Sequence, residues 1–333
     1  MTESLEEILS HLSSVFSGYV VEKPSEVITK GFRGLYIDVY VLRKVKSPII
    51  FRNTERTELT YTTLDGRLHV EVYSRKFKAP EKITGLRVLK EFGQLPKGYL
   101  YNALTRPEQL NNPVSVLYGD SVTAGEQQQG AQIPSRILYS WALSPQEYHC
   151  VAEERTHNAL SEMGTMWETQ EGQRGYKQTL FKNIYMKRGH LLQLVSFYNV
   201  SLEELVFGLG NILHTHSYGA EDNVNARALD NSIIAVILSK PFETPITPYT
   251  VIENIGGRSC DKFLEDDVVK EALLTEIKNQ AGSLGFAEVI DGKKLEDVVN
   301  KVNAIYSSRN LLKELAERLA ESSDEFYRTL VGQ

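Results

Sequence analysis

The chain has 333 residues, of which 41% are hydrophobic, and a formal net charge of −6. That length suits two ordinary domains or one core with large insertions, and no run approaches the roughly 18 apolar residues of a membrane helix. Two cysteines cannot build a disulfide framework or a four-cysteine zinc site. The acidic start Met1–Ser10 lacks the basic and apolar regions of a secretory signal. We therefore expect a cytoplasmic protein with no membrane partner.

Positive charge is concentrated in one part of the chain. From Lys30 to Arg106 the sequence has sixteen lysines and arginines against seven aspartates and glutamates, so the remainder is acidic. A basic segment inside an acidic chain is typical of proteins that contact nucleic-acid phosphates. The alternative is that these cations form a solvated surface and pair with acidic residues elsewhere in the chain.

The first elements are indicated by hydrophobic periodicity. Apolar residues at helical spacing predict a short amphipathic helix over Ser4–Phe16. Gly34–Leu42 alternates and is β-branched, which predicts a first strand that leads into the basic run Arg43–Lys46. Asp65-Gly66 suits a tight turn, so Glu58–Tyr73 is predicted to form a β-hairpin.

The hairpin lies in a basic segment that we expect to stand away from the core. Its flanking cations are Arg52, Arg56, Arg67, Arg75, Lys76 and Lys78. The residues expected to interrupt regular structure after it are Pro80, Gly85, Gly93, Pro96 and Gly98. The sequence therefore predicts that 51–98 is an excursion from the main fold.

The middle of the chain predicts further strands. Arg136–Leu143 is predicted to be one strand after the Gly/Gln-rich loop Thr123–Pro134. Leu180–Tyr185 and Leu191–Tyr198 are rich in β-branched and aromatic residues, with Lys187-Arg188-Gly189 as the turn between them.

A helix and another strand follow. Ser201-Leu202-Glu203-Glu204 offers an N-cap with a carboxylate three residues on, before apolar residues at helical spacing up to Ile212. Ser232–Leu238 is an apolar run that predicts a strand. The order strand–strand–helix–strand is half of a split βαβ sandwich.

The last part of the chain is predicted to be helical. The prolines and glycines of 240–257 predict an extended connector. Three apolar stripes at helical spacing then run from Leu264 to Ile277, from Leu295 to Ile305 and from Leu311 to Phe326. This acidic three-helix region is expected to be a packing or docking module.

Two histidines raise the question of a metal site. His214 and His216 would share one face of a strand and could bind a metal together with Asp222. The apolar run before them favours a helix, whose C-terminus a histidine stabilises as a cap. His149-Cys150, with His157, lacks a Cys-x-x-Cys partner, and Gly119-Asp120-Ser121 lacks the Gly-x-Ser-x-Gly elbow of a nucleophile. We therefore assign no catalytic residue.

The polar insertion Glu153–Lys177 contains a mixture of residue types that suits RNA. Arg155 and His157 could contact phosphates. Apolar side chains in the same insertion could stack on bases or lie at a subunit seam: Met163, Met166 and Trp167. The alternative is an ordinary long loop whose tryptophan packs on the core.

Taken together, these segments resemble a known family. Gly34–Leu42, Gly119-Asp120-Ser121-Val122, Glu154–Asn158 and Leu180–Leu213 occur in an order similar to that of the RAMP superfamily of CRISPR effector proteins. More narrowly, the chain resembles the backbone subunit of the type I-D Cascade complex over residues 30–240. The most specific segment is Glu-Arg-Thr-His-Asn at Glu154–Asn158. The chain departs from the family's glycine-rich loop at Ser217–Arg227.

The resemblance implies an α+β fold. Its core would be an RRM-like, ferredoxin-like palm with an antiparallel sheet, carrying inserted finger and thumb segments and a helical C-terminal addition. On this division the palm comprises 1–50, 99–145 and 177–240, the basic finger 51–98, the thumb hairpin 146–176, and the connector with the helical region 241–333.

The resemblance also implies a function. The protein would be a non-catalytic CRISPR RNA-binding backbone subunit that polymerises along the guide RNA in an RNA-guided antiviral complex, without cofactor or metal. Its partners would be CRISPR RNA, copies of itself, other Cascade subunits and the target nucleic acid, DNA or also RNA. The expected phosphate contacts are Arg33, Lys44, Lys46, Arg52, Arg56, Arg106, Arg155 and His157, and the candidates for the target strand are Arg75, Lys76 and Lys78.

Two functions of other classes remain open at this point. The first is a metal-dependent nuclease that uses His214, His216 and Asp222. The second is a scaffold that assembles with itself in the absence of nucleic acid.

Overall fold

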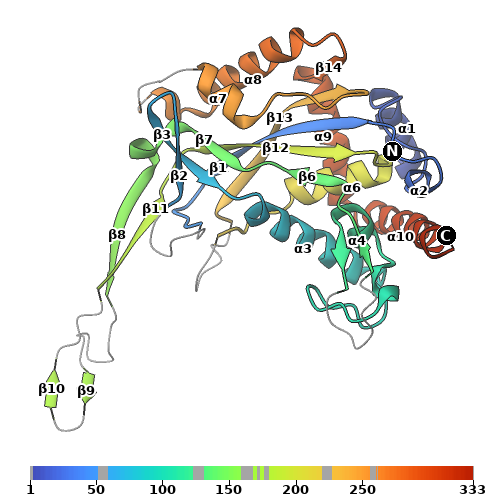
Figure 1. The fold of residues 1–333 in the computed structure, drawn as a ribbon, viewed down its shortest axis with the longest axis horizontal. Coiled ribbons are helices and arrows are strands. Elements are labelled where there is room, and N and C mark those ends of the chain that lie inside the picture. The colour runs from blue at the N-terminus through green and yellow to red at the C-terminus, as the bar shows by residue number, and fades with distance from the viewer. Residues whose placement is uncertain are drawn as a thin grey trace.

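A computed structural model defines one large sheet with helices on both faces. It describes residues 3–51, 59–122, 131–158, 168–170, 173–175, 180–219, 227–255, 260 and 262–332. The eight-stranded sheet has the order β14-β13-β1-β12-β7-β3-β2, and β6 also pairs with β12 (Figure 1). Its strands are β1 (Tyr36–Val45), β2 (Tyr61–Leu64), β3 (Arg67–Val72), β6 (Ile137–Tyr139), β7 (Ala142–Glu147), β12 (His190–Tyr198), β13 (Leu229–Ser239) and β14 (Ala287–Ile290).

Helices and smaller strands complete the described fold. The helices are α1 (Leu5–Val15), α2 (Glu26–Thr29), α3 (Arg75–Glu91), η1 (Pro107–Leu110), α4 (Pro113–Tyr118), α5 (Tyr148–Val151), α6 (Leu202–Leu213), α7 (Pro248–Ile255), η2 (Lys262–Leu264), α8 (Asp266–Gly282), α9 (Gly292–Ser307) and α10 (Arg309–Val331). The remaining strands form three two-stranded sheets: β4 (Asp120–Ser121) with β5 (Gln132–Ile133), β8 (Ala152–Asn158) with β11 (Leu180–Met186), and β9 (Glu168–Gln170) with β10 (Gln173–Gly175).

The central strands have the predicted ferredoxin-like arrangement. Taken in chain order as β1, β7, β12 and β13, they lie in the order 4-1-3-2, and each is antiparallel to its neighbours. Helix α3 lies between the first two of these strands in the chain, and α6 lies between the last two. The expectation of an α+β fold with an antiparallel sheet is therefore confirmed.

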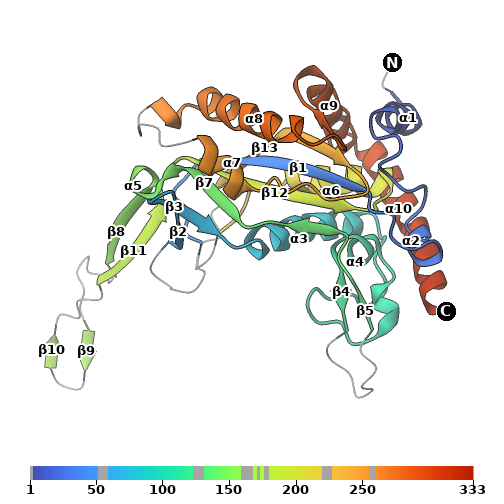
Figure 2. The same ribbon diagram turned by 45° about the horizontal axis from the view of Figure 1, so that its top comes forward.

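Both faces of the central strands are buried. On one face, every second residue of β1, such as Ile37 and Val39, packs against α1, α3, α6, α9 and α10. On the other face, Tyr40 and Leu42 pack against α7 and α8. Figure 2 shows α7 and α8 on one side of the central strands and α3 and α4 on the other. The seven consecutive buried residues Ile37–Arg43 follow from this double cover.

The prediction that Pro80 and Gly85 interrupt regular structure is wrong. Both lie inside the continuous helix α3, whose Leu86 and Leu89 belong to the main core. Gly85 lies there because α3 approaches α6 closely: a Cβ on Gly85 would lie 2.6 Å from Asn211 Nδ2. The hairpin β2–β3 was predicted correctly, but it extends the main sheet because β3 pairs with β7.

Two strand predictions are also corrected. Arg136–Leu143 is not one strand: it splits into β6 and β7 at Ser140, whose Oγ accepts a hydrogen bond from the Leu194 backbone N–H at 3.0 Å. The strands β11 and β12 form as expected, but they do not pair with each other. Strand β11 pairs with β8 and β12 pairs with β1, so the turn Lys187–Gly189 connects two different sheets.

The three C-terminal helices are confirmed as α8, α9 and α10. They are part of the core, with Val298 and Leu315 on one face of the sheet and Leu273 on the other. The predicted extended connector also contains the helix α7, which its many prolines had argued against. Pro248 is the first residue of this helix, where the missing N–H costs no hydrogen bond. No helix among the described residues is long and apolar enough to cross a membrane.

Candidate nucleic-acid interface

A two-stranded arm, β8 with β11, projects from one end of the sheet (Figure 1). Its ladder runs from Asn158 opposite Leu180 to Ala152 opposite Met186. The root is fixed to the body because Ile49 and Met186 exchange two backbone hydrogen bonds of 2.9 Å each. The sequence predicted a protruding hairpin over 146–176. The second strand of the arm is β11, which ends at Met186, ten residues after that predicted end.

The described cations of the arm lie in exposed ion pairs. Arg155 contacts Glu153 at 3.1 Å, and Lys182 contacts Glu154 at 2.7 Å. Such pairs stabilise a fold by only about 0–1 kcal/mol, so an RNA phosphate can replace the carboxylate at little cost. His157 lies on β8 opposite Phe181 in the ladder. The predicted residues outside the described part of the chain are Arg52, Arg56, Met163, Met166, Trp167 and Asp222.

Two lysines predicted to contact phosphates, Lys44 and Lys46, lie near the root of the arm and differ in their ion pairing. Lys44 forms an ion pair with Asp266, at the start of α8. Lys46 is exposed, and no ion pair joins its side chain to the described residues. Its backbone N–H donates to Ala228 O at 2.8 Å, which fixes the strand end that carries it. The side chain of Lys46 is therefore accessible to a phosphate, whereas Asp266 partly neutralises the charge of Lys44.

A buried histidine lies beneath Lys44. His190 is 2% exposed, its Nε2 lies 3.0 Å from Asp266 Oδ1, and its Nδ1 lies 2.9 Å from Gln146 Nε2. Burial lowers the pKa of His190, although Asp266 works in the opposite direction. Burial works to raise the pKa of Asp266, but its hydrogen bonds with Lys44 and His190 outweigh this and lower it.

The three residues predicted to contact the target strand differ in their exposure to solvent. Arg75, the first residue of α3, is exposed, and Lys76 is partly exposed. Lys78 points inward, and its Nζ donates to Ser135 Oγ at 2.8 Å. Burial lowers the pKa of Lys78 to about 8, and the neighbouring Lys82 contributes. Arg75 is therefore the most accessible of the three cations.

Arg33 and Arg106 lie elsewhere. Arg33 precedes β1, and its Nη2 lies 3.9 Å from Glu26. Since β1 has ten residues at about 3.3 Å each, about 30 Å separates its start from the lysines at its end. Arg106 is exposed before η1. The predicted phosphate contacts therefore do not form one patch.

Some cations of the basic segment are buried in the core. Arg43 is 0% exposed, its Nη1 donates to Glu81 Oε1 at 2.7 Å, and its guanidinium lies 4.4 Å from the Phe77 ring centroid. Lys82 forms a largely buried ion pair with Asp120 at 2.9 Å. A count of charges could not show this burial. The predicted contacts also left out the exposed cations Arg87, Lys90 and Lys97, which form no ion pair with the described residues.

The two histidines of the nuclease hypothesis have structural contacts. His214 is the C-cap of α6, as the helical alternative predicted; its ring stacks on Tyr306 at 4.9 Å, and its Nε2 lies 3.2 Å from Asn303 Oδ1. Burial lowers the pKa of His214. His216 Nδ1 lies 3.9 Å from Asp230 Oδ1.

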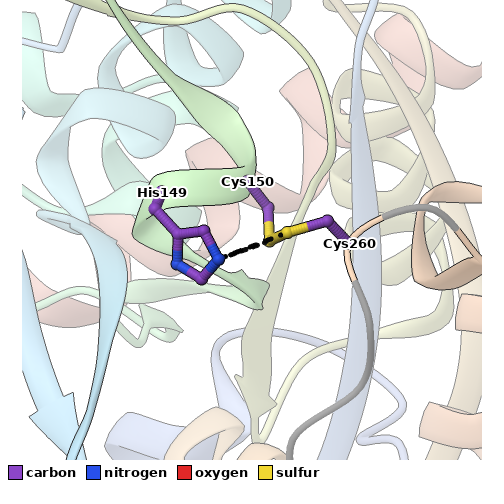
Figure 3. A group of neighbouring side chains, drawn as sticks. All are labelled: His149, Cys150 and Cys260. Carbon is purple, nitrogen blue, oxygen red and sulfur yellow. Dashed lines mark hydrogen bonds between the residues drawn. A yellow bond between two sulfur atoms is a disulfide. The ribbon is translucent and has the colours of Figure 1, made fainter.

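A different group brings metal-ligating side chains together. Within the described ranges, His149, Cys150 and Cys260 are the one group of three such residues close enough to share an ion (Figure 3). The two sulfur atoms are joined in a disulfide, and His149 Nε2 lies 3.4 Å from Cys260 Sγ. In this form the sulfurs are bonded to each other, and the link ties the root of the arm to the segment before α8.

Comparison with known proteins identifies the family. The sequence model of the family described as "Csc2 Crispr" matches residues 25–316. The chain belongs to the Csc2 family. The crystal structure of Thermofilum pendens Csc2 is similar with a TM-score of 0.63 at 15% identity, over 96% of this chain and 94% of that one. No curated protein matches the chain.

Two chains from larger assemblies share the fold with this Csc2 family member. One comes from a "CRISPR RNA-guided surveillance complex", with a TM-score of 0.51 at 11% identity, over 82% of this chain and 98% of that one. The other comes from such a complex described as "pre-nicking", with a TM-score of 0.53 at 10% identity, over 82% of this chain and 99% of that one. At these identities the likeness shows a common fold.

Proposed function

We propose that this Csc2 family member is a non-catalytic, RNA-binding backbone subunit of an RNA-guided CRISPR complex of the type I-D Cascade class. Family membership and the fold shared with chains of CRISPR RNA-guided surveillance complexes support the proposal. Several copies would follow one another along a guide RNA in the cytoplasm, beside other subunits of the complex.

The observation that carries the RNA-binding role is the arm with its cationic root. A projecting ladder fixed to a rigid sheet can cross an RNA strand, while Lys46 and Arg155 contact phosphates. Phosphate contacts are independent of sequence, which a subunit repeated along guides of varying sequence requires. Arg75, the exposed first residue of α3, would contact the target strand.

The test is RNA binding by the purified protein at several salt concentrations, with RNAs of increasing length. We expect the number of bound copies to rise stepwise with RNA length. In the double variant K46A/R155A the slope of log affinity against log salt should fall by about 0.7 for each phosphate that is no longer neutralised. The control is Lys293→Ala, an exposed lysine on α9 that forms no ion pair with the described residues.

Two results would contradict the proposal. Metal bound at unit stoichiometry together with RNA cleavage that EDTA abolishes would favour the nuclease of His214, His216 and Asp222. Filaments that form in the absence of nucleic acid, with no affinity for RNA, would favour a self-assembling scaffold.

A further inference from the structure

Three aromatic rings form a continuous stack at the end of the sheet opposite the arm. Phe32 and Tyr198 stack with centroids 5.0 Å apart and planes 5° apart, and Tyr198 and Tyr36 stack at 4.8 Å and 20°. Tyr36 and Tyr198 lie directly opposite each other on β1 and β12. Phe32 is the outer ring of the stack and is 52% exposed. A flat apolar ring is thus presented to solvent with two others behind it.

The backbone that carries Phe32 is held in place. Asn199 accepts a hydrogen bond from the Arg33 N–H at its Oδ1, 2.9 Å away, and donates its own N–H to Leu35 O at 3.0 Å. Gly34 has φ of +64°, and a Cβ there would lie 2.5 Å from Pro241 O. The loop therefore fits closely between two strand ends, and Phe32 remains half exposed although it is a large apolar side chain.

The position of the stack within the fold matches a known way of binding single strands. Tyr36 and Tyr198 lie on the first and third strands of the ferredoxin-like arrangement, and proteins of the RRM class stack bases on aromatic residues of such a sheet. In this protein α7 and α8 cover that face over Tyr40, Leu42 and Leu192. Tyr36 and Tyr198 do not belong to that buried cluster and are partly exposed.

The charges around the stack suit a polyanion. Lys30 and Arg33 precede β1 and have side chains that are 60% and 47% exposed. Lys240 follows Ser239, the strand partner of Tyr36, and is exposed. The carboxylates near these residues are Glu26, which pairs with both Lys30 and Arg33, the exposed Glu243 and the buried Asp38. Arg33 is about half exposed and its Nη2 lies 3.9 Å from Glu26, so its guanidinium is the cation next to the stack that can reach a phosphate.

We propose that Phe32, Tyr198 and Tyr36 form a platform on which an unpaired base of single-stranded RNA stacks, with Arg33 contacting the adjacent phosphate. The platform rests on the proposed RNA-binding function and adds a second contact about 30 Å from the arm, set by the length of β1. It supplies stacking energy, whereas the arm root supplies charge, and stacking accepts any base because each has a π-face.

The experiment uses the full chain and a single-stranded RNA that carries one 2-aminopurine, whose fluorescence is quenched by stacking. We expect Phe32→Ala to lower the affinity about fivefold or more and to reduce the quenching, because a base loses one aromatic partner. Phe32→Trp should retain both. The matched control is Phe242→Ala, which removes a neighbouring phenylalanine that is 64% exposed but outside the stack.

The outcomes separate the platform from the proposed function. The salt slope should stay unchanged in Phe32→Ala, while K46A/R155A lowers it. If Phe32→Ala binds and quenches as the unaltered protein does while K46A/R155A binds weakly, the platform is refuted and the RNA-binding function stands. Equal losses in Phe32→Ala and Phe242→Ala would indicate a general apolar surface and would also refute it. If the unaltered protein does not bind RNA, both proposals fail.

Discussion

Arg43 on β1 and Arg155 on β8 are both arginines on antiparallel strands, yet their surroundings differ completely. Arg43 is buried under α3 and shares Glu81 with the hydroxyl groups of Tyr139 and Tyr218. Arg155 lies on the arm and contacts Glu153 at a largely solvated surface. The first charge is fully used by the fold, and the second remains available to a ligand. Exposure, and not the density of basic residues in the sequence, therefore separates the cations that stabilise the fold from those accessible to a ligand.

The largest expected effect is on the buried pair. Arg43→Met leaves the charge of Glu81 buried without its cation and should lower the free energy of unfolding by about 3–5 kcal/mol. Arg155→Met, the matched change on the arm, should alter it by less than about 0.5 kcal/mol. Urea unfolding measures both. Similar losses in the two variants would show that body and arm do not differ in the way described.

The close packing of the body makes a second prediction. A Cβ on Gly210 would lie 1.9 Å from Tyr306 Cε2, whereas nothing lies within 4 Å of the Cβ position of Gly282. Gly210→Ala should therefore destabilise the protein by about 1–3 kcal/mol, and Gly282→Ala should be neutral or stabilising. Thermal unfolding of the two variants measures the difference. A neutral Gly210→Ala would mean that α6 and α9 can move apart freely.

A third prediction concerns pH at the junction between body and arm. Burial lowers the pKa of His190 below its ordinary 6.5, so the unfolded chain takes up a proton that the folded protein resists. This contribution to stability is present above about pH 7 and is lost as the pH falls through 6.5 toward the lowered folded value. When the pH is lowered from 7.5 to 5.5, the free energy of unfolding of His190→Gln should fall by less than that of the unaltered protein. Parallel curves would contradict the burial argument.

The smallest expected effect separates the two lysines at the root. Asp266→Asn removes the carboxylate that pairs with Lys44 and should strengthen RNA binding by less than about 1 kcal/mol. The gain should disappear when Lys44 is also changed to alanine. Asp267→Asn is the control, because Asp267 forms no ion pair with the described residues. A gain that persists without Lys44 would show that general charge, and not this pair, is responsible.

Local signals in the sequence predicted local structure well. The capping box of Ser201 and Glu204 marks the start of α6, and Asp65-Gly66 marks the turn of the β2–β3 hairpin. Strand pairing was harder to predict because it depends on contacts between distant segments. Leu180–Tyr185 and Leu191–Tyr198 are adjacent in the sequence, but the first pairs with β8 and the second pairs with β1.

The candidate site was predictable in part for the same reason. Glu154–Asn158 indicated a projecting hairpin, and Lys46 was placed at a strand end. The partial burial of Lys78 could not be foreseen, because it depends on a contact with Ser135, 57 residues away. The aromatic stack was missed as well, although Phe32 and Tyr36 on either side of a glycine turn, with Tyr198 ending a later strand, are a signal that could have suggested it.

The claim that the protein holds guide RNA is tested most directly by isolating it from its native host at low salt and sequencing the RNA bound to it. We predict short RNAs that carry CRISPR repeat sequence joined to many different spacers, with several copies of the protein on each. RNA drawn at random from the cell, or protein without RNA, would contradict this function.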